Sequence, residues 1–132
     1  MSMFPTEFSS IWMAMALLVM VLVLVGMFMD PYGAVILVSA TIASVAYDSG
    51  INPVHFWMVT LVAFELGYLS PPVALNHLLT RQVVGEEEVR LAAEESRGMP
   101  FWYRHERILL PLVTMGIALI IVAFVPLMIG YN

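Results

Sequence analysis

Two adjacent prolines interrupt a long apolar run that extends from about residue 54 to residue 84. The pair closes the stretch GYLSPP at residues 67–72. Because proline has no backbone N–H and its ring clashes with the preceding turn, an α-helix cannot continue unbroken through the pair. Each proline still suits the first turn of a new helix, with Ser70 as its N-cap, and Gly67 stands where a preceding helix would end. The sequence therefore predicts two half-helices separated by a break.

The composition places this break inside a membrane. Hydrophobic residues make up 61% of the 132 residues and charged residues only 11%, which is typical of a membrane protein. Within a bilayer, broken backbone is tolerated only where protein buries it or where it lines a cavity. Since the chain has no cysteine, disulfides and thiolate metal sites are excluded.

The basic residues indicate the orientation. All five lie in one segment of the chain: Arg81, Arg90, Arg97, Arg104 and Arg107. Cytoplasmic loops carry the excess of Lys and Arg, so we expect the Arg81–Arg107 segment in the cytoplasm. The acidic residues behind the net charge of −5 do not count in this rule. No basic patch remains for nucleic acid, and the lack of Lys or Arg before the first apolar run disfavours a cleaved signal peptide.

The N-terminal third of the chain predicts two helical arms. After a short polar lead, Ser9 or Ser10 would cap a first helix from Ile11 to about Val25. The second arm would run from Pro31 to about Tyr47, with Asp30 as its N-cap and the proline in its first turn. A loop signal, DSGINP at residues 48–53, follows.

Two arrangements of these arms are open. In one, both arms cross the membrane and Asp30 lies at the cytoplasmic surface. In the other, they form a re-entrant hairpin with Asp30 buried at its tip. A cytoplasmic turn usually carries Lys or Arg, and the first basic residue of the chain is Arg81, so the charge pattern favours the hairpin. Both arrangements leave residues 48–55 in the periplasm.

The remainder predicts a surface helix and one last span. In residues 85–98, Glu86, Arg90 and Glu94 have the i,i+4 spacing of a solvated helix. An aromatic belt, Phe101-Trp102-Tyr103, precedes a spanning helix from Ile108 to Ile129, with Pro111 in its first turn and Pro126 near its end. The C-terminus would then be periplasmic. We thus divide the chain into residues 1–84 (hairpin and broken helix), 85–106 (cytoplasmic connector) and 107–132 (C-terminal transmembrane helix).

The two interruptions offer complementary chemistry. Half-helix C-terminal ends present free carbonyl oxygens and a partial negative charge, which suit Na⁺, while N-terminal ends suit an anionic substrate. If the breaks meet, they form one site for a cation and an anion. The candidate Na⁺ ligands are Gly26, Phe28, Asp30, Gly67, Leu69 and Ser70. The candidate substrate-binding residues are Pro31, Gly33, Ser70, Pro71 and Pro72.

Two acids and three histidines allow alternatives. Asp30 is either a cation ligand or only a helix N-cap, and Glu65 takes part in transport or hydrogen-bonds loop backbone. His77 fits helix packing better than a pathway. We place His55 in the periplasmic loop and His105 at the inner interface, and no HExxH or comparable spacing indicates a metal enzyme. Apart from Na⁺, no metal or cofactor is expected, and the chain is not expected to be an enzyme.

Three stretches together resemble a known family: GMFMDP at 26–31, SGINPVHFW at 49–57 and ELGYLSPPVALN at 65–76. They resemble the C-terminal part of the large membrane subunit of tripartite ATP-independent periplasmic (TRAP) transporters, over about residues 11–84 by motif and the last helix by position. The resemblance implies an all-α membrane protein, half of an elevator-type transporter with inverted repeats. Each repeat would hold a re-entrant hairpin and a discontinuous transmembrane helix.

The resemblance also implies a function and partners. The activity would be Na⁺-coupled uptake of organic acids such as dicarboxylates across the bacterial inner membrane. The partners would be the rest of the large permease subunit, a small membrane subunit, a periplasmic substrate-binding protein and the lipid bilayer, with no nucleic acid. The six residues that fall on the family's site motifs are Gly26, Asp30, Gly67, Ser70, Pro71 and Pro72.

The chain departs from the family's pattern in sequence and length. Where many members carry Asn before the break, this chain has Ala63-Phe64-Glu65, and Ala74 stands where Gly is common. Prolines common in the second arm are replaced around Ala40 and Ser44. A full large subunit is several times longer, so the chain would be a split gene product, a truncated reading frame or a fragment. The alternative functions are a small membrane accessory or structural protein, or a non-functional fragment, without transport of its own, and a homo-oligomeric channel or exporter.

Overall fold

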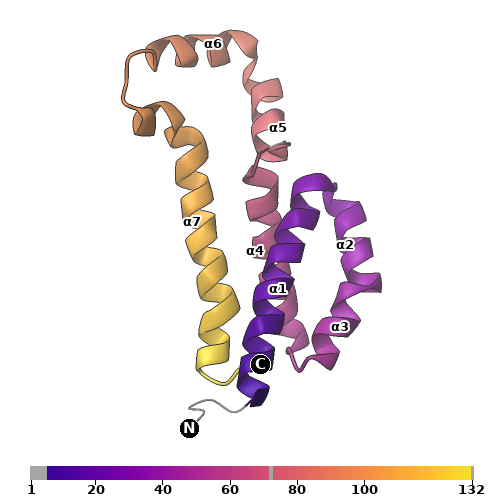
Figure 1. Cartoon of the computed structure of the whole chain (residues 1–132). Coiled ribbons are helices and arrows are strands. Elements are labelled where there is room, and N and C mark those ends of the chain that lie inside the picture. The colour runs from indigo at the N-terminus through magenta and orange to yellow at the C-terminus, as the bar shows by residue number, and fades with distance from the viewer. Residues whose placement is uncertain (1–5, 72, 132) are drawn as a thin grey trace.

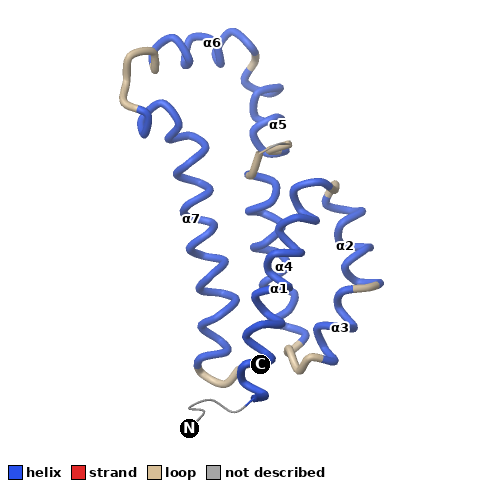
Figure 2. The backbone as a smooth tube through the Cα atoms, viewed as in Figure 1, coloured by secondary structure: helices blue, strands red, loops and turns tan. Residues whose placement is uncertain are grey.

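The computed structural model describes residues 6–71 and 73–131, and within them the regular structure is α-helical (Figure 2). The helices are α1 (Thr6–Phe28), α2 (Pro31–Ala40), α3 (Ile42–Asp48), α4 (Pro53–Leu69), α5 (Leu75–Val84), α6 (Glu86–Glu95) and α7 (Phe101–Met128). The chain is therefore an all-α membrane protein, as its composition predicts.

The helices form an elongated bundle with a side arm (Figure 1). The first arm, α1, runs beside α4 in the same direction, and α2 and α3 fold back next to it. Beyond α4, α5 continues past the tip of this hairpin, α6 lies across the far end, and α7 returns along the bundle. The start of α1 and the end of α7 both lie at the end opposite α6.

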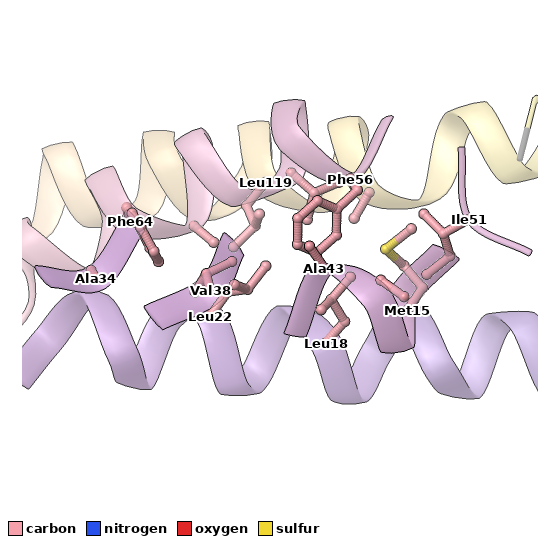
Figure 3. Packing of buried hydrophobic residues seen from close by; sticks show 14 of the residues in the cluster. Met15, Leu18, Leu22, Ala34, Val38, Ala43, Ile51, Phe56, Phe64 and Leu119 are labelled. Carbon is pink, nitrogen blue, oxygen red and sulfur yellow. The ribbon is translucent and has the colours of Figure 1, made fainter. Parts of the chain in front are cut away.

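The core lies where α1, α4 and α7 meet the inner side of the α2–α3 arm. Its fully buried side chains include Met15, Leu22, Val38, Phe56 and Val59. Figure 3 shows that the side chains it labels, which include Met15, Leu22, Val38 and Phe56, come from helices distant in sequence and point into one apolar layer. Trp12 of α1 stacks on Phe124 of α7, with ring centroids 5.7 Å apart. This layer holds the hairpin against the broken helix.

Two glycines allow the backbones of α1 and α4 to approach closely. A Cβ atom added to Gly67 of α4 would lie 2.7 Å from the backbone carbonyl carbon of Gly26 of α1. One added to Gly26 would lie 3.0 Å from the Cα atom of Phe64. Neither helix could carry a side chain at this point without moving away. α4 ends at Leu69, so Gly67 lies in its last turn and not at its end as the sequence predicted. The role of Gly67 is to let the two backbones touch.

The second arm is not the continuous helix that we expected. It bends by 44° at Thr41, between α2 and α3. Thr41 has φ −127° and ψ −65°, and its hydroxyl donates to the Leu37 carbonyl at 2.6 Å. Ser39 and Ser44 also donate to backbone carbonyls, those of Val35 and Thr41. Such hydroxyl bonds compete with the helical ladder and favour a bend without proline.

Two helix boundaries also differ from the prediction. α1 begins at Thr6, so Ser9 and Ser10 lie inside it and do not cap it. α7 begins at Phe101, which places the aromatic belt within the helix and Pro111 inside it, away from the first turn. In both cases the helix extends into polar or aromatic sequence that apolar periodicity does not mark.

In α6, Arg90 pairs with Glu87 at 3.9 Å, and both side chains are well exposed.

Within residues 6–71 and 73–131, two helices are long and apolar enough to span a membrane alone. They are the α1 segment Ser10–Phe28 and the whole of α7, while the bent α2–α3 pair passes the same criterion as a unit. The apolar α4 is shorter than a full span. Helix length alone therefore does not decide between a spanning arm and a hairpin. The level at which α1 ends beside α4, fixed by the contact between Gly26 and Gly67, bears on this question more directly.

We predict that Gly67→Ala destabilises the fold. The new methyl group would meet backbone atoms that cannot rotate away, and such overpacking costs about 1–3 kcal/mol. Gly116→Ala in α7 is the matched control, because nothing lies within 4 Å of its added Cβ and it should gain about 0.5–1 kcal/mol. Thermal unfolding in detergent would compare the two. Equal stability of both variants would contradict the close-contact interpretation.

Candidate functional site at the junction of the hairpin and the broken helix

The tip of the hairpin lies beside the break in the second helix. The contact between Gly26 and Gly67 fixes the end of α1 next to the end of α4. Figure 1 shows the turn between α1 and α2 at the level of the α4–α5 break, with α5 extending further. At 1.5 Å per residue, the ten residues of α5 add about 15 Å beyond that level. The two predicted interruptions therefore meet, and the tip ends short of the arginine-bearing segment.

Asp30 caps the helix that leaves the tip. Both of its carboxylate oxygens accept from the backbone N–H of Gly33 at 3.1 Å, and Pro31 occupies the first turn of α2. A Cβ atom on Gly33 would lie 3.1 Å from the Asp30 Oδ1 atom, so the cap leaves little space there. The N-cap prediction is confirmed, and the Asp30 side chain remains exposed in this chain.

Three carbonyls at the end of α1 lack a backbone donor. The N–H of Met29 bonds to the carbonyl of Val25 at 3.0 Å, and the next bonded N–H groups, those of Gly33 and Ala34, both turn to Asp30. Pro31 has no N–H to offer. Within the described chain, the carbonyls of residues 26–28 therefore receive no backbone hydrogen bond. They lie at the C-terminal end of α1, which carries the partial negative charge of the helix dipole.

The break in the second helix does not have the predicted cap. Ser70 ends α4 and does not begin the next helix: its hydroxyl donates to the Leu66 carbonyl at 2.6 Å, and its N–H bonds to the Gly67 carbonyl at 3.0 Å. The serine N-cap prediction is wrong because a hydroxyl one turn after a helix carbonyl can fold back onto it. The carbonyls of Leu66 and Gly67, in the last turn of α4, are thereby satisfied.

The next two carbonyls of α4 stay without a backbone partner among the described residues. The donors for Tyr68 at i+3 and i+4 would be Pro71 and Pro72, which have no N–H. No bond from Val73 to the Leu69 carbonyl forms either. Pro72 itself lies outside the described residues, so its predicted substrate role stays a prediction. The double proline thus leaves two carbonyls available at the break.

The second half-helix starts later than predicted. α5 begins at Leu75, after a turn in which the N–H of Ala74 bonds to the Ser70 carbonyl at 3.0 Å. Ala74 has φ 45° and ψ 58°, and among the described residues it alone has a positive φ without being glycine. Left-handed backbone costs an L-residue roughly 1–2 kcal/mol. The residue where the chain departs from the family's glycine is therefore strained.

Glu65 makes a contact that sequence reasoning missed. Its Oε1 atom accepts from the Asn76 amide at 2.8 Å, which joins α4 to α5 across the break. We had expected either a transport role or a bond to loop backbone. Helical spacing cannot predict this pair, because the turn between the helices decides which residues face each other. Both Glu65 and Asp30 also lie within electrostatic reach of the Tyr68 hydroxyl, a buried group with no hydrogen-bond partner here.

Two of the three histidines take structural positions. His55 lies inside α4 and not in the preceding loop, is 1% exposed, and its Nε2 atom lies 2.9 Å from the Val122 carbonyl of α7. The loop prediction was wrong because α4 starts at Pro53, capped by Asn52. His105 bonds the Phe101 carbonyl within α7. Among the described residues, no group of three His, Cys, Asp or Glu side chains could hold a metal ion.

The remaining predicted residues surround the junction. Gly26 and Gly67 are buried at the contact, Leu69 and Ser70 are half-buried in the break, and Phe28, Pro31 and Pro71 are exposed. The structure brings the tip and the break together but leaves the junction open on the side of Phe28 and Pro31. An interrupted helix that meets a hairpin in an apolar helical bundle defines a membrane protein of the secondary-transporter type.

The comparisons identify the family. Residues 2–128 match the family model described as tripartite ATP-independent periplasmic transporter, DctM component, so the chain belongs to this family of TRAP transporter large permeases. It is 29% identical over 115 residues to the C4-dicarboxylate TRAP transporter large permease protein DctM of Pseudomonas aeruginosa, covering 87% of this chain and 24% of that protein. No solved structure gives a significant match.

Two further relatives agree with this assignment. The chain is 34% identical over 64 residues to the protein of the same name from Vibrio cholerae, covering 48% of this chain and 14% of that relative. It is 26% identical over 106 residues to the isethionate TRAP transporter permease protein DctMQ of Oleidesulfovibrio alaskensis, covering 80% of this chain and 14% of that relative. The chain thus spans about a quarter or less of the length of these curated relatives, which are permeases and not enzymes.

We predict that Ala74→Gly stabilises the break. Glycine removes the left-handed strain of roughly 1–2 kcal/mol and costs about 0.5–1 kcal/mol in chain entropy, so the net gain should be about 0.5 kcal/mol. Ala118→Gly, inside the right-handed α7, should instead lose about 1 kcal/mol. Denaturation of the two variants in the same detergent gives the comparison. Destabilisation of both to a similar extent would contradict the left-handed turn at Ala74.

Proposed function

We propose that this chain supplies the transport elements of one repeat in a Na⁺-coupled transporter that takes up organic acids from the periplasm. The observation that carries the proposal is the meeting of the hairpin tip with the helix break. Carbonyls of residues 26–28 and of Tyr68 and Leu69 lack backbone donors there. Carbonyl oxygens at negative helix ends are hard ligands suited to Na⁺. The candidate cation site is thus built mainly from backbone.

The side chains refine the proposed cation site. Gly26, Phe28 and Leu69 contribute carbonyls, and Gly67 contributes mainly the close approach that brings the two helix ends together. Ser70 fixes the last turn of α4 through the Leu66 carbonyl and is thereby less free to bind an ion. Asp30 adds a carboxylate near the tip, although its present partner is the Gly33 N–H.

The anionic substrate is proposed to bind beside the cation. Pro31 and Gly33 lie in the first turn of α2, where the positive helix end favours a carboxylate. On the other side, the turn that begins after Pro71 leads into the N-terminus of α5, and Pro72 keeps its predicted substrate role as a proposal. The names of two relatives specify C4-dicarboxylates, and the name of a third specifies isethionate. All of these are small organic anions. A dicarboxylate is our first candidate for this chain.

The geometry and the position of the arginines together support a proposed membrane placement. We propose that α1 and α2–α3 form a re-entrant hairpin, that residues 48–55 face the periplasm of a bacterial inner membrane, and that Arg81–Arg107 faces the cytoplasm. The tip would then end about one α5 length from the cytoplasmic surface. Residues 1–84 would form the mobile transport elements, 85–106 the connector and 107–132 the last span.

The chain covers a small part of its relatives, so the proposal includes partners. The rest of the large permease subunit, a small membrane subunit and a periplasmic substrate-binding protein would complete the transporter. The assembled unit would work by an elevator movement. Na⁺ would be the coupling ion, with no other cofactor. A small accessory membrane protein without transport activity is the alternative, and the experiment below separates the two.

We predict that changing both Pro71 and Pro72 to Ala abolishes Na⁺-dependent uptake while the chain still inserts. The new N–H groups would bond to the carbonyls of Gly67 and Tyr68, and an interior proline costs a helix roughly 3 kcal/mol relative to alanine. Uptake of a radiolabelled C4-dicarboxylate into proteoliposomes that hold the complete transporter would measure the effect.

A proline in an unbroken helix provides the control. Pro111→Ala in α7 removes an internal proline without touching the junction, and its uptake should remain close to wild type. If the double-alanine variant retained full Na⁺-driven uptake, the break would be a packing kink and the site would lie elsewhere. If no variant, wild type included, supported uptake, the accessory alternative would replace the proposal.

A further inference from the structure

The second half-helix has little to hold it in place. α5 contains no buried residue, and its side chains are half-buried or exposed along its length. Its backbone joins α4 through the turn between Ser70 and Ala74. That turn includes a strained residue, because the backbone of Ala74 is left-handed. As the N-cap of α5, Ala74 also makes no side-chain hydrogen bond to the helix. The orientation of α5 relative to α4 therefore depends on something other than core packing.

One side-chain hydrogen bond meets this need. The Oε1 atom of Glu65 accepts from the Nδ2 atom of Asn76 at 2.8 Å in a partly buried position. Among the described residues it is the side-chain hydrogen bond that joins α4 to α5. Glu65 stands one turn before the end of α4, and Asn76 is in the first turn of α5. The bond therefore spans the break and restrains both the spacing and the rotation of the two helices.

The chemistry of the pair makes it a strong restraint. A hydrogen bond to a charged acceptor is roughly twice as strong as one between neutral groups. In apolar surroundings, the loss of either side chain leaves the other without a hydrogen-bond partner, which costs free energy. The two carbonyls left free by the prolines, those of Tyr68 and Leu69, belong to the turn that the bond closes. Their direction thus depends on it.

We propose that Glu65 and Asn76 form a clamp across the break, and that the clamp positions the Tyr68 and Leu69 carbonyls. Both are positioning residues: they hold the backbone that faces the ion and do not themselves need to touch it. This positioning role rests on the proposed Na⁺ site, whereas the clamp itself does not. The required property is an accepting oxygen at residue 65, not its negative charge.

Amide hydrogen exchange of α5, measured on the chain in lipid nanodiscs, tests the clamp. Glu65→Ala and Asn76→Ala should each raise the exchange rates of the amides of residues 78–84 by about tenfold or more, the scale of a hydrogen bond to a charged group. The double variant should exceed neither single variant, because both remove the same bond. Glu65→Gln should raise the rates less than Glu65→Ala does, since its amide oxygen can accept from the same donor but forms a weaker, neutral bond.

The control is Gln82→Ala, which removes a carboxamide from an exposed position of the same helix and should leave these rates unchanged. If Asn76→Ala behaved like Gln82→Ala, the clamp would be overturned. Additive effects in the double variant would overturn it as well, because independent effects would show that the two side chains do not act through one bond.

The Na⁺ concentration for half-maximal uptake by the complete transporter tests the positioning role. Glu65→Ala and Asn76→Ala should raise it about tenfold, and Glu65→Gln should raise it less than Glu65→Ala does. If α5 loosened while this concentration stayed constant, the positioning role would be overturned. If the wild-type transporter showed no Na⁺ dependence, the proposed function would fail, and the exchange experiment would still decide whether the clamp exists.

Discussion

The contact between the backbones of Gly26 and Gly67 is the constraint on which the rest of the arrangement depends. It fixes the register between the first hairpin arm and the broken helix, and a single methyl group on Gly67 would meet the α1 backbone at 2.7 Å. Because α1 and α4 run in the same direction, their C-terminal ends arrive at the same level. Two helix ends with uncapped carbonyls are thereby brought side by side.

The polarity of the junction comes from missing backbone donors more than from side chains. Pro31 and the Pro71–Pro72 pair remove the N–H groups that would have satisfied the preceding carbonyls. The serine and threonine hydroxyls nearby act locally: Ser70 closes the last turn of α4, and Thr41 bends the second arm. The side-chain bond between Glu65 and Asn76 then restrains the α4–α5 turn. This division of roles explains how a chain with 11% charged residues can present a polar site.

The sequence predicted the elements of this fold better than their joints. Helix breakers and the arginine segment located the hairpin turn, the interrupted helix and the last helix, because proline and charge act through local chemistry. The bend at Thr41 was missed because hydroxyls can bond either to solvent or to the helix backbone. Ser70 was assigned to the wrong helix for the same reason. The Glu65–Asn76 bond and the Gly26–Gly67 contact depend on how helices meet, which no local pattern records.

The central claim is that the hairpin tip ends at the helix break inside the membrane. Because the chain has no cysteine, single introduced cysteines can report directly how deep the hairpin tip lies in the membrane. Tyr32 follows the tip and is 84% exposed, and Ser49 and Ser96 lie in the segments that we propose to face the periplasm and the cytoplasm. With a membrane-impermeant thiol reagent, Ser49→Cys should label from the periplasm, Ser96→Cys from the cytoplasm, and Tyr32→Cys far more slowly from the cytoplasm than Ser96→Cys. Labelling of Tyr32→Cys from the cytoplasm as fast as Ser96→Cys would place the tip at the cytoplasmic surface and contradict the account.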